Sequence, residues 1–141
     1  MPAPGETLAA AAYERFLGGK GVNQSVAIAR AEGSVRHVGA VGPDGDWALG
    51  EIAKFGVDTG AIARVEAPTG HAVIYVDAAG ENQIVILGGA NQEVDLDRFA
   101  DLLARAVAEA SAPIWVLLQN ETNGVADIVG HAKRAGCKIA Y

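Results

Sequence analysis

The chain has 141 residues and a formal net charge of −6; half of its residues are hydrophobic and 20% are charged. This composition is typical of one folded domain and excludes an intrinsically disordered chain. The eleven basic residues are scattered, so a nucleic-acid partner is not expected, because binding to a phosphate backbone requires clustered Lys and Arg.

The first part of the chain predicts a strand, a glycine turn, a helix and a second strand. Apolar residues within Thr7–Leu17 predict a short strand, which ends at the glycine-rich turn Gly18–Gly21. Small apolar residues then recur at helical spacing from Val22 to Ala31. The β-branched, alternating residues of Val35–Val41 predict the next strand, because the turn-forming sequence Gly-Pro-Asp-Gly follows them.

The middle of the chain predicts a helix followed by a β-hairpin. Trp47–Phe55 carries apolar residues at helical spacing and is followed by a glycine that would end the helix. Gly56–Thr59 is expected to lead into a connector. Two β-rich runs, His71–Val76 and Gln83–Leu87, are then separated by Asp-Ala-Ala-Gly-Glu-Asn, a composition that favours a hairpin loop of more than two residues.

The last third of the chain alternates between helix and strand. Helical stripes occur over Asp95–Ala110 and Thr122–Ala135, and a further strand begins at Lys138–Tyr141. Between the helices, the continuous apolar run Ile114–Leu118 is typical of a strand buried on both faces. This alternation implies parallel strands joined by right-handed crossovers. We therefore predict one α/β domain over residues 1–141, with the β-hairpin as an appendage.

The turn Gly18–Gly21 and the residues after it are the most informative segment. Glycines let a ligand approach the backbone, and the start of the following helix offers unpaired amide N–H groups. Lys20 adds a cation with three donors, and Asn23 adds a donor and an acceptor, a combination that suits a ligand with many hydroxyl groups. The segment matches neither the P-loop nor the dinucleotide-binding pattern. From the residues alone, a plain structural turn stays open as the alternative.

The sequence from Gly18 to Ala27, which reads Gly-Gly-Lys-Gly-Val-Asn-Gln-Ser-Val-Ala, closely resembles the N-terminal signature of the ribokinase (phosphofructokinase B type) family of carbohydrate kinases. The form of the glycine-lysine turn is similar to that of the ribokinase branch. Further matches follow in the expected order along nearly the whole chain. The matching segments are Pro2–Thr7, Val38–Asp44, Gly56–Thr59, Pro68–Gly70, Gly80–Asn82, Gly88–Asn91 and Leu117–Glu121.

The resemblance implies a ribokinase-like three-layer sandwich with a parallel sheet and a small β-lid hairpin, whose lid elements would be residues of about 7–17 and 70–90. The family's first strand, with its Gly-Ser-x-Asn-x-Asp type segment, and its C-terminal half have no counterpart in the sequence. We therefore expect an incomplete sandwich. Exposed sheet or lid edges invite pairing with another chain, so we also expect a homo-oligomer, with a marginally stable chain as the alternative.

The resemblance also implies a sugar pocket. Gly18, Gly19, Lys20 and Asn23 would line it, and Glu121 would accept hydrogen bonds from a sugar hydroxyl. The position of Glu121 agrees, because a carboxylate at the C-terminal end of a parallel strand faces the ligand crevice. The alternative is that Glu121 simply favours the dipole of the helix that it precedes. The apolar lid residues Ala72, Ile74 and Ile86 would pack either over the sugar or within an ordinary sheet.

By resemblance, the complete family enzyme uses ATP and Mg²⁺ to phosphorylate a pentose such as D-ribose. Its catalytic base and anion hole lie in a Gly-Ala-Gly-Asp segment, which this sequence lacks. Phosphoryl transfer depends on positioning the phosphates and on stabilising developing charge. We therefore expect no catalytic, cofactor-binding or metal-binding residue in this chain and no kinase activity from the chain alone.

Three functions follow from these expectations and stay open: an inactive sugar-binding portion of a kinase, a non-catalytic sugar-binding or assembly module, and a structural remnant. His37, His71 and His131 have no partners at metal-ligand spacing and are interpreted as structural or solvated. No apolar stretch approaches the roughly 20 residues of a membrane span, and no secretory signal is visible. A cytoplasmic location is expected.

Overall fold

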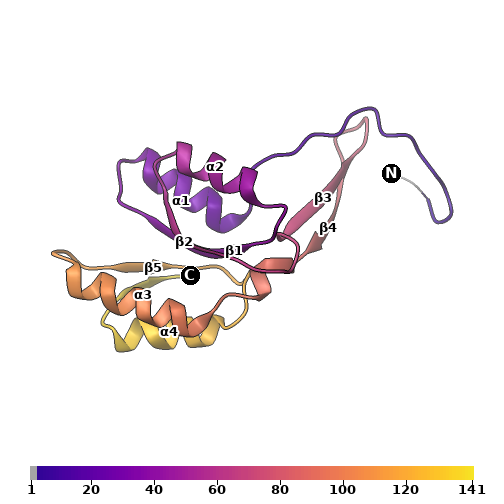
Figure 1. Cartoon of the computed structure of the whole chain (residues 1–141). Helices are drawn as coiled ribbons and strands as arrows, with labels where there is room; N and C mark the ends of the chain where they lie inside the picture. The colour runs from indigo at the N-terminus through magenta and orange to yellow at the C-terminus, as the bar shows by residue number, and fades with distance from the viewer. Residues whose placement is uncertain (1–2) are drawn as a thin grey trace.

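The computed structural model describes residues 3–141 and confirms the predicted α/β class (Figure 1). The parallel strands form two separate pairs, β1–β2 and β5–β6, and β3–β4 is an antiparallel hairpin. In chain order the elements are α1 (Lys20–Arg30), β1 (Arg36–Val41), α2 (Asp46–Lys54), β2 (Asp58–Arg64), β3 (His71–Val76), β4 (Asn82–Leu87), the 3-10 helix η1 (Gly89–Gln92), α3 (Leu96–Glu109), β5 (Trp115–Leu117), α4 (Val125–Arg134) and β6 (Lys138–Ala140).

The layers of the sandwich come from two halves of the chain. Figure 1 shows α1 and α2 on one side, the strand pairs in the middle, and α3 and α4 on the opposite side. The first half, residues 20–64, buries its own apolar cluster between its helices and the β1–β2 pair, because the helices present their apolar stripes to one face of the strands. The buried members are Val41, Ile52, Val57 and Ile62.

The second half, residues 95–140, buries a separate cluster between α3, α4 and the β5–β6 pair. Asp95 caps α3, because its side chain accepts a hydrogen bond from the Arg98 backbone N–H at 2.9 Å. Val38 of β1 reaches across to pack against this cluster, so the two halves touch in the middle layer. The buried members are Phe99, Leu103, Ile128 and Ala132.

The prediction that the strand at Ile114–Leu118 is buried on both faces is wrong. β5 has only three residues, and Val116 alone faces the helices. Trp115 and Leu117 point the other way and are 61% and 41% exposed. The physical reason is that alternate side chains of a strand face opposite sides, and the described residues provide a covering layer on one side only.

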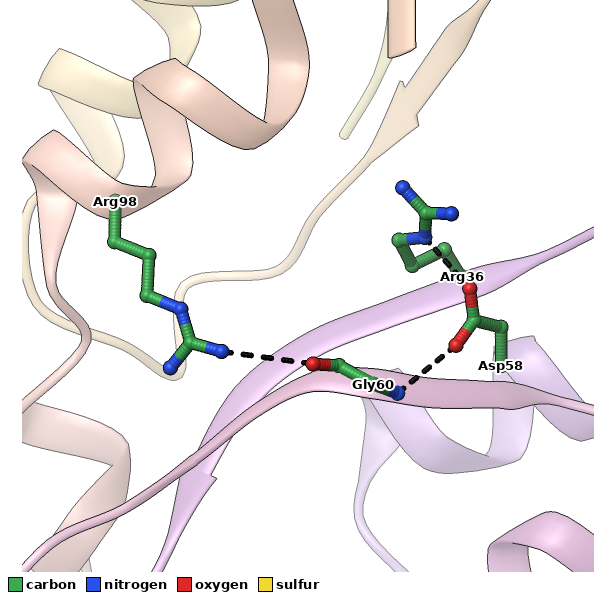
Figure 2. Close-up of polar contacts among 4 residues, drawn as sticks. All are labelled: Arg36, Asp58, Gly60 and Arg98. Carbon is green, nitrogen blue, oxygen red and sulfur yellow. Dashed lines mark hydrogen bonds and ion pairs between the residues drawn. The ribbon is translucent and has the colours of Figure 1, made fainter. Parts of the chain in front are cut away.

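The connector expected to follow Gly56–Thr59 is instead the start of β2. β2 pairs with β1 through a bulge, since Arg36 lies opposite Asp58 while Val38 lies opposite Ala61. Figure 2 shows how the bulge is held: the Asp58 carboxylate accepts from Gly60 N at 2.9 Å and from Arg36 Nε at 2.7 Å. Arg98 of α3 adds a long hydrogen bond to the Gly60 carbonyl, at 3.5 Å. Pairing with β1 therefore overrides a local sequence that is weak in β-forming residues.

The β-hairpin lies where it was predicted and projects away from the rest of the molecule (Figure 1). Its apolar side chains are exposed on both faces, with exposed fractions between 43% and 70%. Ala72, Ile74 and Ile86 therefore pack under no other layer in the described residues. The exposed large apolar residues of the hairpin are Val73, Ile74, Tyr75, Val76, Ile84, Val85, Ile86 and Leu87.

The strand predicted for Thr7–Leu17 does not form. This segment has neither helix nor strand and is almost entirely exposed. A strand requires the edge of another strand, and four consecutive alanines give this segment little β propensity of its own. The membership of residues 7–17 in a lid stays a prediction. In the part of the chain that the structure describes, no helix is long and apolar enough to cross a membrane.

Candidate functional site

The glycine-lysine turn forms the start of α1. Gly19 is the N-cap residue, with φ 91° and ψ 145°, a backbone conformation that residues other than glycine rarely adopt. Among the described residues, no side chain caps this helix start. A Cβ atom added at Gly18 or Gly19 would meet nothing within 4 Å, so the space above the turn is open. The helix start is therefore accessible to a ligand that can accept hydrogen bonds from its backbone N–H groups.

Lys20 and Glu121 meet at this turn although 101 residues separate them in the chain. Lys20 Nζ contacts Glu121 Oε1 directly, and the two side chains are 65% and 41% exposed. Lys20 comes from the first turn of α1, and Glu121 from the loop between β5 and α4. An exposed ion pair of this kind adds only about 0–1 kcal/mol to stability. Its significance is positional, because it brings a cation and a carboxylate to one point.

Asn23 lies one turn into α1, at the same end of the helix. Its backbone N–H donates to the Gly19 carbonyl at 3.0 Å, and the residue is exposed. Asn23 therefore lies about one helical turn from Gly19 and Lys20. The structure places all five predicted binding residues at exposed positions, and the contact between Lys20 and Glu121 joins the two parts of the set.

A partly buried polar pair lies beside the glycine turn. The hydroxyl of Ser25 and Nδ1 of His37 are 2.8 Å apart. His37 Cε1 lies only 3.4 Å from the position that a Cβ atom of Gly21 would take. Burial lowers the pKa of His37 below its usual range, so the ring is neutral at pH 7. This packing agrees with the interpretation of His37 as structural.

A second set of hydrogen bonds fixes the root of the hairpin beside the turn that follows β1. Asp44 Oδ1 accepts from the backbone N–H and the hydroxyl of Thr69, at 2.9 and 2.8 Å. Gly42 N in turn donates to Thr69 Oγ1 at 3.0 Å. The hydrogen bond from the Thr69 backbone is the main cause that lowers the pKa of Asp44, with the Thr69 hydroxyl second. Thr69 precedes β3 by two residues, so the hairpin leaves the core at a fixed point.

Two residues near Glu121 were not singled out in the sequence. Gln92 Nε2 donates to the Glu121 backbone carbonyl at 3.1 Å, and the side chain of Asn123 forms two hydrogen bonds with the backbone of Val94. No local sequence pattern predicts such contacts, because each joins residues that are 29 positions apart.

The described residues offer no cluster of side chains suited to a metal ion. They contain no group of three or more His, Cys, Asp or Glu side chains that could hold a metal ion. The carboxylate of Glu121 is already paired with Lys20. This arrangement suits a neutral ligand with hydroxyl groups better than a metal ion.

Comparison with known proteins identifies the family. The family model described as "pfkB family carbohydrate kinase" matches residues 2–122. Ribokinase of Staphylococcus aureus is 38% identical in an alignment of 125 positions, which covers 82% of this chain and 41% of that protein. Ribokinase of Haemophilus influenzae is 35% identical in an alignment of 142 positions, which covers 96% of this chain and 45% of that protein.

Solved structures agree with this match. Ribokinase of Thermotoga maritima superposes with a TM-score of 0.80 at 33% identity, over 98% of this chain and 44% of that one. Ribokinase of Arabidopsis thaliana, solved in complex with ribose and ATP, superposes with a TM-score of 0.76 at 30% identity, over 99% and 46% of the two chains. The chain thus spans less than half the length of these curated relatives and structures. It belongs to the pfkB family of carbohydrate kinases.

Proposed function

We propose that this chain is the sugar-binding portion of a ribokinase-type kinase, an enzyme that transfers the γ-phosphate of ATP to a pentose such as D-ribose. The observation that carries the proposal is the contact between Lys20 and Glu121 at the open glycine turn. A sugar hydroxyl both donates and accepts hydrogen bonds. The ammonium group supplies donors and the carboxylate supplies acceptors, so the pair matches this chemistry.

The neighbouring residues support the same ligand class. Gly18 and Gly19 leave open space at the backbone, and Asn23 adds a neutral amide one turn further along α1. Charge-assisted hydrogen bonds between a hydroxyl and a carboxylate are stronger than neutral ones, so we assign Glu121 the larger share of the affinity. D-ribose is the preferred sugar, since the Staphylococcus aureus and Haemophilus influenzae relatives are ribokinases and one similar structure was solved with ribose and ATP.

The chain alone is proposed to be inactive as a kinase. Its 141 residues contain no counterpart of the Gly-Ala-Gly-Asp segment that the resemblance implies for the base and the anion hole. ATP and Mg²⁺ are thus assigned to the complete family enzyme, and we propose that this chain binds neither. A cytoplasmic location is part of the same proposal.

Calorimetric titration with D-ribose tests the binding proposal. The unmodified chain should release measurable heat, and Glu121→Gln should weaken ribose binding by about 10- to 100-fold, because a hydrogen bond to a charged group is lost. Glu109→Gln makes the same change at the exposed end of α3 and should leave the affinity unchanged. Absence of heat from the unmodified chain would favour the structural remnant, and turnover of ribose with ATP and Mg²⁺ would contradict the proposed inactivity.

A role in assembly is the second candidate, and the hairpin favours it. Apolar side chains cover both faces of β3–β4 and lie under no other element in the described residues. An isolated two-stranded hairpin is only marginally stable in water, so a second copy of the chain would stabilise it by covering one face. We propose a homo-oligomer formed through this hairpin.

A further inference from the structure

The loop that carries Glu121 belongs to no helix or strand, yet four hydrogen bonds tie it to one other segment. Gln92 Nε2 donates to the Glu121 carbonyl at 3.1 Å. The backbone N–H of Asn123 donates to the Asn91 carbonyl at 3.3 Å. The side chain of Asn123 then pairs with Val94, accepting from its N–H and donating to its carbonyl, each at 2.9 Å.

The Asn123 side chain acts like a short piece of neighbouring strand. It satisfies both backbone polar groups of Val94, a residue that is only 8% exposed. Buried backbone groups that lose their partners are costly, so the side chain and the backbone of Val94 hold each other in one geometry. The amide of Asn123 provides one donor and one acceptor for this purpose, which a carboxylate cannot do.

The same segment forms the root of the hairpin (Figure 1). Ala90 is fully buried, and its N–H donates to the Pro68 carbonyl at 2.9 Å. The packing is close, because a Cβ atom on Gly89 would lie 2.2 Å from the Pro68 carbonyl oxygen, and one on Gly70 would lie 2.5 Å from that of Gly88. Residues 88–94 thus connect the start of the hairpin on one side with the loop of Glu121 on the other.

We propose that Gln92 and Asn123 are positioning residues for sugar binding, which hold Glu121 opposite Lys20 and tie it to the root of the hairpin. The proposal rests on the proposed function, in which Glu121 accepts from a sugar hydroxyl. Glu121 is exposed and lies in a loop, so without these bonds it would lose conformational entropy on binding the sugar. Both residues act through Glu121, and neither is assigned a contact with the sugar.

We call the hydrogen bonds that Gln92 and Asn123 form between the Glu121 loop and residues 88–94 the clamp. Two near-isosteric variants test the clamp by ribose titration. Gln92→Met keeps the length of the side chain but removes its donor, and Asn123→Asp keeps the shape but cannot donate to the Val94 carbonyl. Each should raise the ribose dissociation constant by about three- to tenfold, as expected for one lost hydrogen bond. Glu109→Met places the same apolar side chain at the exposed end of α3, away from the loop, and should have no effect. Equal ribose affinity of the unmodified chain and both clamp variants would overturn the proposal.

A double-mutant cycle separates positioning from a general loss of structure. If Gln92 acts through Glu121, Gln92→Met should change ribose affinity much less when Glu121→Gln is already present. A purely structural effect would instead add to that of Glu121→Gln. Additive effects would therefore count against the proposal even if each single variant binds ribose weakly.

Hydrogen exchange provides a readout that needs no sugar. Amides of residues 88–94 and 121–124 should exchange faster in Asn123→Asp, while those inside α3 should not change. If the unmodified chain binds no ribose, the proposed function fails, and this measurement still decides whether the clamp exists. Unchanged protection of both segments would then overturn the clamp on its own.

Discussion

At the scale of single residues, the start of α1 depends on the backbone freedom of Gly19. Its φ of 91° lies in a region that is open almost only to glycine. Gly18 next to it does not have a positive φ in this range, yet both positions would place a Cβ atom in open space. A comparison of substitutions at Gly18 and Gly19 therefore measures the backbone strain at Gly19 without a contribution from steric contact.

Gly19→Ala should lower the free energy of unfolding by about 1–3 kcal/mol, since alanine is strained in this backbone conformation. Gly18→Ala is the matched control and should be neutral or stabilising by up to about 1 kcal/mol, because it restricts only the unfolded chain. Urea unfolding followed by circular dichroism measures both. Equal effects of the two variants would show that the strain assigned to Gly19 is absent.

At the scale of elements, the hairpin exposes apolar side chains on both of its faces. Along the β3–β4 register, Ile74 lies opposite Ile84 on one face, and Val73 lies opposite Val85 on the other. Cross-strand pairs of this kind stabilise a sheet, but here neither face is covered in the described residues. The proposed homo-oligomer is the arrangement that removes this surface from water.

Ile86→Lys on the hairpin should weaken self-association by about tenfold or more, because a buried isoleucine contributes about 1.5–3 kcal/mol. Ile86 is 70% exposed in the single chain, so the stability of the monomer should change little. Ala104→Lys on the exposed side of α3 is the control and should leave association unchanged. Sedimentation velocity over a concentration series measures the effect. A single monomer boundary at every concentration of the unmodified chain would remove the basis of the assembly proposal.

At the scale of the whole molecule, the two halves have separate apolar cores. Ile52 belongs to the cluster of the first half and Ile128 to that of the second. The connections between the halves include the packing of Val38 on the second cluster and the bond from Arg98 to Gly60. Few shared contacts mean weak coupling, so the halves should open separately.

Ile52→Val and Ile128→Val form a matched pair, since both residues are at most 8% exposed. Each should cost about 0.5–1.5 kcal/mol. In hydrogen exchange, Ile52→Val should weaken protection mainly within residues 20–64, and Ile128→Val mainly within residues 95–140. Equal loss of protection throughout the chain in both variants would show that the molecule unfolds as one unit.

The elements with strong local signals were predicted well from the sequence. The helix of Asp95–Ala110 has both an N-cap aspartate and an apolar stripe, and its bounds in the structure are Leu96–Glu109. By contrast, β2 was missed and the strand at Thr7–Leu17 was wrong, because a strand forms only where another strand offers its edge. The helix expected from Thr122 begins at Val125, after Gly124 in a left-handed conformation.

Some residues of the candidate site could likewise be predicted from local sequence, and others could not. The sequence singled out Lys20 and Glu121 through their motifs, but the importance of Gln92 and Asn123 depends on partners 29 positions away. Such contacts leave no periodic or local pattern, so they could be found only in the folded chain.

The α/β alternation, the hairpin and the glycine-lysine turn could be predicted from the sequence, because each is encoded by residues that are close together in the chain. The contact of Lys20 with Glu121, the exposed face of β5 and the bonds between the hairpin root and the Glu121 loop are visible only in the folded chain. The physical reason is that periodicity and turn chemistry specify elements, whereas packing between distant segments specifies which side chains meet.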